Sequence, residues 1–356
     1  MKNEKRDITL PHIYLDHNAS TNLRIEAKEI MFSVVDEVGN PSSIHTEGRR
    51  AKGIIERARM QIAEAIGAVN AKVIFTSSAT EACALALRGR SIVGSGIEHD
   101  AVLSWVSNSL KSDGNGLVEI VDPSKSTLQL ANSETGILQE LPKDIAVSDL
   151  TQAFGKIPVS FSWLEIGIGI ISAHKIGGPK GIGALIVRDD IDIEPLILGG
   201  GQEQGLRAGT ENVMAIAGFG AAAEASARDL TLGCWDEIAE LRDRLEDVIL
   251  TESKETLIIG KDNNRLANTS CISVPGWQSE TQVIKMDLAG FSISSGSACS
   301  SGKVKKSKAL MTMGYSEDIN KSAIRVSLGR QTSRTDIDKF IKAWITSRNH
   351  FLAKVV

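Results

Sequence analysis

The sequence is poor in aromatic side chains, which make up only 4% of its 356 residues, and its net charge at neutral pH is only −4. So few aromatic residues argue against a surface on which sugars or single-stranded bases stack. A small negative charge, from 44 acidic and 40 basic residues, does not predict attraction to nucleic acid or to an anionic membrane. Neither kind of partner is therefore expected.

Long apolar runs and clustered cysteines are also missing. No run approaches the roughly 18 residues that cross a bilayer, and residues 1–7 mix both charge signs, unlike a secretory signal. The four cysteines, Cys83, Cys234, Cys271 and Cys299, are far apart and form no Cys-x-x-Cys pair. This spacing favours free thiols in a reducing compartment over a disulfide framework or a zinc site. The cytoplasm is the expected location, and no metal site is expected.

The order of predicted elements indicates the fold class. Short apolar runs alternate with helical patterns, which predicts an α/β fold with a mostly parallel sheet between helices. The clearest helix is predicted over Thr46–Ile66, where apolar residues recur at three- and four-residue steps until Gly67. The expected strands are Lys72–Thr76, Leu117–Val121, Ile145–Asp149, Gly167–Ser172, Gly183–Val187, Thr256–Ile259, Cys271–Val274 and Phe291–Ser294.

The length of the chain and a change of pattern near residue 250 predict two domains. We expect a large domain over residues 13–250 and a smaller α+β domain formed by residues 1–12 and 251–356. The smaller domain contains a Ser/Gly-rich stretch at about 294–307, which includes Cys299. Five lysines lie between residues 303 and 321, and nearby positive charge favours the nucleophilic thiolate. An incidental cysteine in a flexible loop is the alternative interpretation.

Lys175 is the most informative residue. It follows a predicted buried strand and precedes a Gly/Pro turn, and a lysine is rarely buried unless it is paired. Asp149 ends another predicted strand upstream. An aldehyde-carrying cofactor needs such a pair, namely an amine for a Schiff base and a carboxylate that keeps a pyridinium nitrogen protonated. Taken alone, Lys175 is weak evidence, and a surface lysine after a strand is the favoured interpretation.

A second feature is the turn Ser77–Thr80 between a predicted strand and a predicted helix. The unpaired N–H groups and the dipole of a helix N-terminus can bind an anion there. An ordinary turn with Thr80 near the helix cap is the alternative.

Together these motifs resemble the pyridoxal-phosphate-dependent cysteine desulfurases, which belong to the class-V aminotransferases of fold type I. That fold has a seven-stranded-type sheet sandwiched by helices, and the loop form here is similar to the group with a long cysteine loop. The similarity runs in the family's order from Tyr14 to about Arg330. The motifs that carry it are Ser172-Ala-His174-Lys175 with the following Gly-Gly-Pro-Lys-Gly, Arg207-Ala-Gly-Thr210, Ser294-Ser-Gly-Ser-Ala-Cys299 and Ile324-Arg325-Val-Ser-Leu-Gly329.

The resemblance implies a role for each matching residue. Lys175 would bind the cofactor as a Schiff base and move the Cα proton, and Asp149 would pair with the pyridinium nitrogen. Arg325 would clamp the substrate carboxylate with its planar fork. His99 would stack on the ring and assist proton transfer, and Cys299 would attack the substrate sulfur. The other implied contacts are Gln152 at the phenolic oxygen, Ala79, Thr80, Ser172 and His174 at the phosphate, Thr210 at the partner subunit's phosphate, and Asn132 and Ser133 beside the substrate.

The implied reaction removes sulfur from L-cysteine, leaving L-alanine and a persulfide on Cys299. The enzyme would be a homodimer that hands this sulfur to an iron–sulfur scaffold or another acceptor protein. Three positions depart from the family pattern: Ser133 replaces an asparagine, Ser78 replaces a glycine, and Cys83-Ala84 replaces a polar pair. Added bulk at Ser78 matters only if that position needs a positive φ.

Three other functions are alternatives to this one. A selenocysteine lyase uses closely related chemistry, and a weakly active or silent homologue could serve as a binding subunit. Retention of Lys175, Cys299 and Arg325 together argues against the silent homologue. A dinucleotide-binding oxidoreductase is disfavoured because the glycine loop at 178–183 runs into an apolar strand rather than opening a helix.

Overall fold

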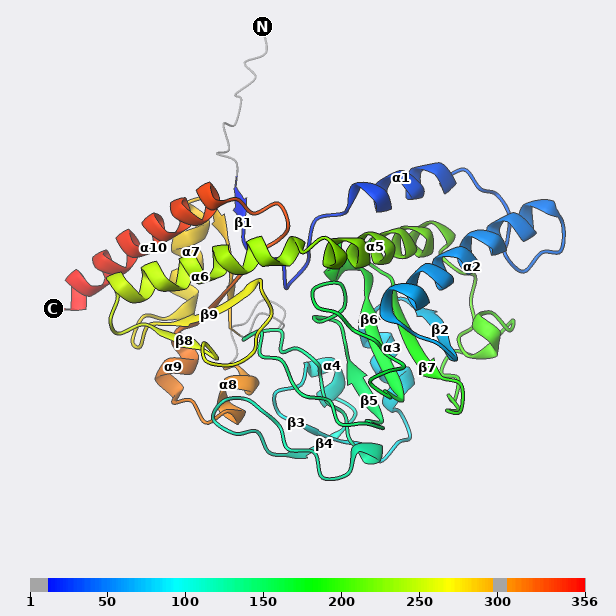
Figure 1. Cartoon of the computed structure of the whole chain (residues 1–356), viewed down its shortest axis with the longest axis horizontal. Coiled ribbons are helices and arrows are strands. Elements are labelled where there is room, and N and C mark those ends of the chain that lie inside the picture. Colours follow the sequence, from blue (N-terminus) through cyan, green and yellow to red (C-terminus); the bar gives the residue numbers. More distant parts are fainter. Residues whose placement is uncertain (1–11, 297–305, 356) are drawn as a thin grey trace, which may run out of the picture.

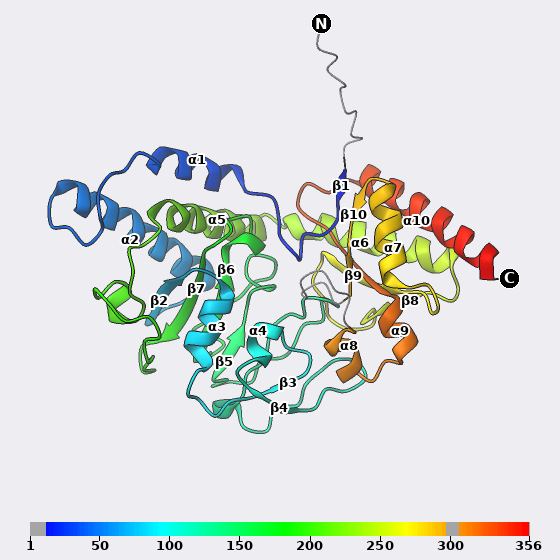
Figure 2. The same ribbon diagram turned by 180° about the vertical axis from the view of Figure 1, so that it is seen from behind.

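The computed structural model describes residues 12–296 and 306–355. Two parts lie side by side in Figures 1 and 2, and each has its own sheet and helices. The N-terminal part contains α1 (Ile25–Val34), α2 (Thr46–Ile66), β2 (Ala71–Thr76), α3 (Ala79–Leu87), β3 (Val93–Ser95), α4 (Asp100–Leu103), β4 (Ser107–Leu110), η1 (Pro123–Lys125), β5 (Val147–Asp149), β6 (Ile168–Ser172), η2 (Ala173–Lys175), β7 (Gly183–Arg188), η3 (Glu203–Gly205) and α5 (Val213–Thr231).

The sheet of the N-terminal part has the strand order β2-β7-β6-β5. The backbone at Ser126 and Thr127 continues it, because Thr127 bridges Val147 of β5 and Ser126 bridges Val93 of β3, both in parallel. The parallel pair β3–β4 then ends the sheet. Strand β7 is antiparallel to both β2 and β6, and the other strands of this sheet run in one direction. The predicted α/β fold with a mostly parallel sheet is confirmed.

Helices cover both faces of this sheet. On one face α2 and α5 pack against β6 and β7, with Ile55, Ile62 and Phe219 in the same apolar cluster as Ile171 and Ile186. On the other face, α3 packs its apolar residues against the same strands. Helix α2 occupies the predicted range, and Gly67 ends it with φ 64°, a left-handed conformation that glycine adopts without strain.

The C-terminal part contains the antiparallel sheet β11-β12-β9-β8. Its core includes Ile249, Ile272, Trp277, Phe340 and Trp344. The elements are α6 (Cys234–Glu252), β8 (Leu257–Ile259), β9 (Thr269–Ser273), α7 (Ser279–Leu288), β10 (Phe291–Ser292), β11 (Ser294–Ser295), α8 (Lys308–Thr312), α9 (Glu317–Ser322), β12 (Ala323–Ser327) and α10 (Arg334–Val355).

The N-terminal strand belongs to this C-terminal part. Strand β1 (Ile13–Tyr14) pairs in parallel with β10, and Leu15 lies in the C-terminal core. Helix α6 also packs there through Ile238, Leu245 and Ile249. The domain boundary expected at residue 250 stays a prediction, and this packing of α6 favours a boundary near Gly233.

One expected strand is wrong. Leu117–Val121 forms only an isolated bridge between Val118 and Ser112. The side chain of Gln139 takes the place of a strand neighbour, because its Oε1 accepts from Val118 N at 3.0 Å and its Nε2 donates to Gly116 O at 2.7 Å. The segment therefore satisfies its backbone without a sheet partner.

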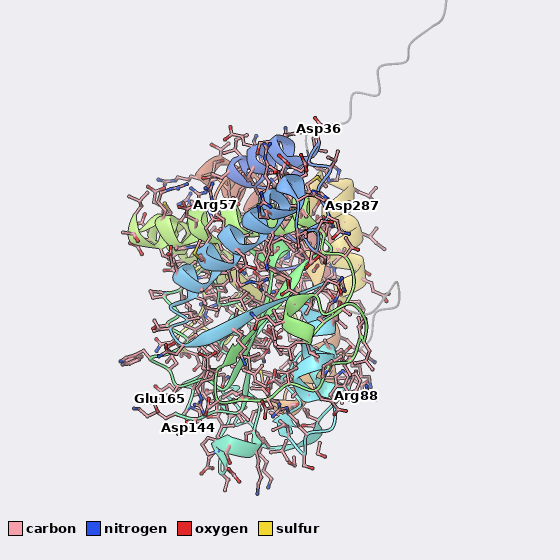
Figure 3. The ribbon with its side chains drawn as sticks, turned by 90° about the vertical axis from the view of Figure 1, so that its right-hand side faces the viewer. Asp36, Arg57, Arg88, Asp144, Glu165 and Asp287 are labelled. Atoms are coloured by element: carbon pink, nitrogen blue, oxygen red, sulfur yellow. The ribbon has the colours of Figure 1, made fainter. Side chains whose placement is uncertain are left out.

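Charged side chains of both signs point outward from the body, including the labelled Asp36, Arg57, Arg88, Asp144 and Asp287 in Figure 3. Within the described residues, no helix is long and apolar enough to cross a membrane.

Candidate active site

A cavity of about 330 Å³ lies where the carboxyl ends of β5 and β6 meet the C-terminal part. Ligand sites in open α/β sheets typically form at this end of the strands. The walls include the start of α3, the N-terminal segment at Asn18 and Ala19, and Arg325 of β12. The predicted site residues that line the cavity are Ala79, Thr80, His99, Ser133, Asp149, Gln152, Ser172, His174, Lys175 and Arg325.

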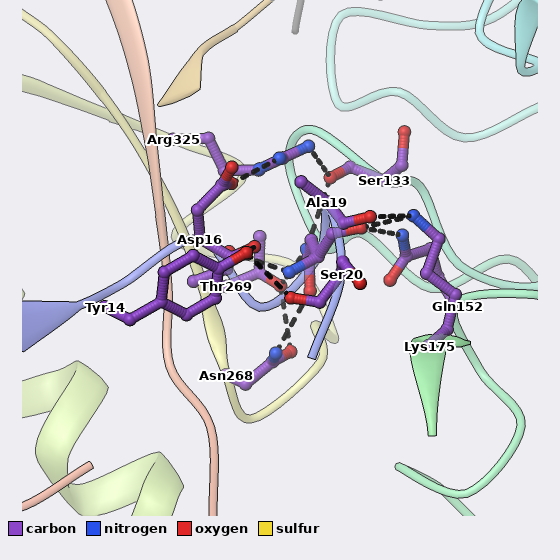
Figure 4. A network of polar contacts seen from close by, with 12 residues as sticks. Tyr14, Asp16, Ala19, Ser20, Ser133, Gln152, Lys175, Asn268, Thr269 and Arg325 are labelled. Atoms are coloured by element: carbon purple, nitrogen blue, oxygen red, sulfur yellow. Dashed lines mark hydrogen bonds and ion pairs between the residues drawn. The ribbon is translucent and has the colours of Figure 1, made fainter. Parts of the chain in front are cut away.

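Lys175 ends the short helix η2 that follows β6. Its Nζ donates to the backbone oxygens of Asn18 at 2.6 Å and Ala19 at 3.0 Å, so the amine is held across the cavity (Figure 4). Gln152 Nε2 donates to the same Asn18 oxygen at 2.9 Å. The N-terminal segment therefore fixes two predicted site residues at once.

Asp149 ends β5, and its Oδ1 accepts from Thr151 N at 2.9 Å. Two further acidic groups lie close to it. Burial, and then the charge of Asp149, raise the pKa of Glu98 to about 8, and burial followed by Asp149 also raises the pKa of the Cys83 thiol well above its ordinary value. Glu98 and Cys83 are therefore neutral near pH 7, and Asp149 is the acidic side chain that lines the cavity.

The turn between β2 and α3 has the features of an anion site. Ser78 is the N-cap of α3, and its Oγ accepts from Glu81 N at 3.3 Å. The cap is thus Ser78 rather than Thr80. Ser78 has φ −174°, which is extended backbone, so the residue that replaces the family's glycine is not strained. Ala79 and Thr80 of this helix start line the cavity, and the N–H groups at a helix start can bind an anion.

Two histidines in the wall have defined states. Burial, and then the charges of Lys175 and Lys180, lower the pKa of His174 to about 4, so its ring is neutral at pH 7. His99 caps α4, and its Nδ1 accepts from Ala101 N at 3.1 Å. Because Nδ1 accepts this hydrogen bond, Nε2 is the ring nitrogen that carries a proton.

Arg325 is buried on β12 beside the cavity. One terminal nitrogen pairs with Asp16 Oδ1 at 2.7 Å, and the other donates to Ser133 O at 3.1 Å (Figure 4). The buried Nε has no hydrogen-bond partner. The arginine is therefore held in place by two contacts, and the guanidinium, which has five N–H donors, keeps others for a ligand.

Three predicted site residues do not line the cavity. Thr210 is exposed and lies away from it. Asn132 is buried, and its Oδ1 accepts from Glu134 N and Thr135 N at 2.9 Å each, which holds the turn that presents Ser133. Cys299 lies outside the described residues. The roles expected for these three residues stay predictions.

The segments on either side of the Cys299 stretch are fixed near the cavity. On one side, Ser294 of β11 pairs with Arg325. On the other side, Ser307 Oγ donates to Glu134 Oε2 at 2.5 Å. Burial is the main cause that raises the pKa of Glu134 to about 7.

The sequence interpretation missed Asn18 as the centre of the polar network. Asn18 Nδ2 donates to Ser133 O at 3.2 Å and to Thr269 Oγ1 at 2.8 Å, which joins the two parts of the molecule (Figure 4). The polar turn after Asp16 was a local signal that this segment matters. Within the described residues, no group of three or more His, Cys, Asp or Glu side chains could hold a metal ion.

Comparisons with known proteins agree with this geometry. A family model described as aminotransferase class-V matches residues 13–340. A cysteine desulfurase from Cereibacter sphaeroides is 36% identical across 94% of this chain and 95% of its own length. Cysteine desulfurase IscS from Dictyoglomus turgidum is also 36% identical, across 92% of each chain. The X-ray structure of a NifS-like protein from Rickettsia africae matches with a TM-score of 0.85 and 34% identity, across 94% of this chain and 99% of that one.

Proposed function

Because the chain belongs to the class-V aminotransferase family, we propose that it is a pyridoxal-phosphate-dependent cysteine desulfurase. The substrate is L-cysteine, and the products are L-alanine and a persulfide on Cys299. One observation carries the proposal. A single cavity brings together Lys175, Asp149 and Arg325, although these residues come from distant parts of the sequence.

The residues present fit pyridoxal 5'-phosphate. The start of α3 offers free N–H groups for a phosphate, and Ser172 and the neutral ring of His174 stand beside it. Gly183 lets β7 approach this turn closely, since an added Cβ would lie only 2.6 Å from the backbone carbon of Ser78. At the other end of the cavity, Asp149 supplies a carboxylate for a protonated ring nitrogen.

When it is bound, the cofactor supplies an electron sink for the negative charge that develops at the substrate Cα. Lys175 Nζ would hold the aldehyde of the cofactor, and it is placed to take a proton from the substrate Cα and to return one. Arg325 orients the substrate carboxylate through a charge-assisted hydrogen bond. The Cys299 thiolate attacks the substrate Sγ, so that a sulfur–sulfur bond forms while the Cβ–Sγ bond breaks. Cβ then takes up a proton, and alanine leaves.

The proposal includes a homodimer. Thr210 lies away from the cavity of its own chain and is free to reach a partner subunit. Phe32, Val38, Ile44 and Leu198 are 68–90% exposed, although a second copy could bury them. The molecular mass in solution, measured by sedimentation, tests this part. A monomer at micromolar concentration would contradict it.

We further propose that the protein works in the cytoplasm and passes its sulfur to an iron–sulfur scaffold or another acceptor protein. The free thiols of Cys83, Cys234 and Cys271 are consistent with a reducing compartment.

The first experiment is an absorbance spectrum of the purified protein before and after L-cysteine is added. We expect a visible band near ~420 nm, from the Schiff base between Lys175 and the cofactor, that changes with cysteine. The band should be lost in Lys175→Ala. In Cys299→Ser the band should remain while persulfide and alanine formation fall to background. A protein that stays colourless with added pyridoxal phosphate would point instead to a silent homologue with a binding role.

A further inference from the structure

An ion pair joins two sequence motifs at the phosphate end of the cofactor cavity. Arg207 begins the motif that ends at Thr210, and Glu81 lies in the first turn of α3. Arg207 Nε donates to Glu81 Oε1 at 2.7 Å, and one of its terminal nitrogens donates to Glu81 Oε2 at 3.2 Å. This two-point contact fixes the guanidinium against the carboxylate. The proposed reaction assigns no role to either side chain.

Glu81 is part of the turn that starts α3. Its Oε2 accepts from Ser77 N at 2.7 Å, while its own N–H donates to Ser78 Oγ at 3.3 Å. This pattern is close to a capping box, which satisfies N–H groups that a helix start leaves without partners. The adjacent residues Ala79 and Thr80 line the cavity. Glu81 therefore shapes the turn beside the proposed phosphate position without lining the cavity itself.

The charge of Glu81 opposes an anion at this helix start. Burial disfavours the carboxylate, but hydrogen bonds from Arg207 and Ser77 outweigh burial and lower the pKa of Glu81, so the group is ionised at pH 7. A carboxylate in the first turn and a phosphate draw on the same helix dipole and repel each other. The neutral ring of His174 supplies no charge against this repulsion. Arg207 does, because its hydrogen bond to Glu81 is the main cause that raises its pKa and keeps it charged.

Arg59 cannot take over from Arg207, because Glu203 holds it. The two terminal nitrogens of Arg59 donate to the Glu203 carboxylate at 2.8 and 2.9 Å. The charges of Glu203 and Glu211 also act on Arg207. Loss of Arg207 would therefore leave an excess of carboxylates beside the start of α3.

The segment that carries Arg207 is held at its beginning. Glu203 and Gln204 both adopt left-handed backbone, with φ of 47° and 60°, which is costly for residues other than glycine. Such strain persists only where the surrounding contacts enforce it. The ion pair of Glu203 with Arg59, and a hydrogen bond from Phe75 N to Glu203 Oε2 at 2.8 Å, do so here. The fold thus presents Arg207 to α3 from a fixed position.

On the basis of the proposed function, we infer that Arg207 is a positioning residue for the cofactor phosphate that acts through Glu81. Its guanidinium neutralises the Glu81 carboxylate. Glu81 can then hold the backbone at Ser77 while the start of α3 stays favourable for an anion. The ligand class that this arrangement favours is a phosphate monoester, and a ligand without a phosphate gains nothing from it.

The test is a binding titration of the cofactor-free, full-length protein with pyridoxal phosphate and, in parallel, with pyridoxal, which lacks the phosphate. Arg207→Met should weaken binding of pyridoxal phosphate by about 10-fold and leave binding of pyridoxal unchanged. Arg207→Lys keeps the charge but loses the planar fork, so it should stay close to the wild type. Arg207→Met combined with Glu81→Gln should recover the wild-type affinity, because the charge that Arg207 offsets is gone.

A purely structural ion pair gives a different pattern. The combined variant would then bind as weakly as Arg207→Met, and pyridoxal would bind more weakly as well; either result overturns the inference. Arg57→Met is the matched control for loss of one positive charge, since Arg57 is an exposed arginine of α2 (Figure 3), and it should change neither affinity.

Two further measurements keep the inference testable. If Arg207→Met does not fold, Glu81→Gln alone decides, because it should bind pyridoxal phosphate at least as tightly as the wild type, and weaker binding overturns the inference. If the wild-type protein binds no pyridoxal phosphate, the proposed function fails. Inorganic phosphate then tests Arg207, since it should raise the melting temperature of the wild type more than that of Arg207→Met. Equal rises overturn the inference.

Discussion

The close approach of β7 to the turn before α3 gives a sharp test of how the phosphate end of the cavity is built. Gly183 begins β7 and pairs with Thr76 on one side and Ser172 on the other. A Cβ at Gly183 would lie 2.6 Å from Ser78 C, 2.8 Å from Ala79 N and 3.0 Å from a third backbone atom. Every one of these atoms belongs to the backbone, so no side-chain rotation relieves the contact.

Gly183→Ala should therefore push the start of α3 outward. Non-bonded carbon atoms prefer a separation of about 3.5–4.0 Å, so the turn must move by roughly 1 Å. Overpacking of this kind costs about 1–3 kcal/mol. If that cost falls on the bound form, the dissociation constant of the cofactor should rise by about 5- to 150-fold.

The assay is an absorbance titration of cofactor-free protein with pyridoxal phosphate. Gly53→Ala is the matched control, because a Cβ at Gly53 in α2 meets nothing within 4 Å. This control should leave the dissociation constant unchanged and stabilise the helix by about 1 kcal/mol. A folded Gly183→Ala protein that binds the cofactor as tightly as the wild type would refute the idea that Gly183 shapes the phosphate end of the cavity.

Two further predictions concern charge. The pKa of Glu98 rises from 4.5 to about 8, so its contribution to stability is full below pH 4.5 and is lost as pH rises to 8. Glu98→Gln should reduce this decline in the free energy of unfolding by on the order of a few kcal/mol. Melting temperatures of both proteins at pH 5 and pH 8 measure it. If the variant shows the same decline as the wild type, Glu98 is not its source. Arg325→Lys should raise KM for L-cysteine by about 10- to 100-fold, because lysine lacks the planar fork. Steady-state kinetics measures this, and an unchanged KM would show that Arg325 does not bind the substrate carboxylate.

Local patterns were sufficient to predict the main elements. The periodicity of α2 and the glycine after it fixed both ends of that helix, because burial of one apolar face and a left-handed cap are properties of a short stretch. The expected strand at Leu117–Val121 failed because Gln139 supplies its hydrogen bonds, and a side chain 21 residues away leaves no local pattern.

The same limit applies to the site. The family resemblance named most residues of the cavity wall, and the structure places ten of them around one space. Asn18 and Lys156 escaped notice because Lys156 Nζ donates to Asn18 Oδ1 across 138 residues of sequence. No spacing rule predicts a buried lysine amine held by two amides, since only the folded chain brings them together.

The pairing of β1 with β10 has a consequence for the synthesis of the protein. Residues 13–18 are made before residues 268–327, yet they hydrogen-bond to residues 290–292, to Asn268 and Thr269, and to Ser327. During translation, residues 13–18 cannot form these hydrogen bonds until most of the chain has left the ribosome. Asn18 accepts a hydrogen bond from Lys175 and is itself held by Ser327 of β12. The amine therefore reaches its final surroundings only after β12, which also carries Arg325, has emerged. The contacts of the site are therefore complete only when nearly the whole described chain is available to fold.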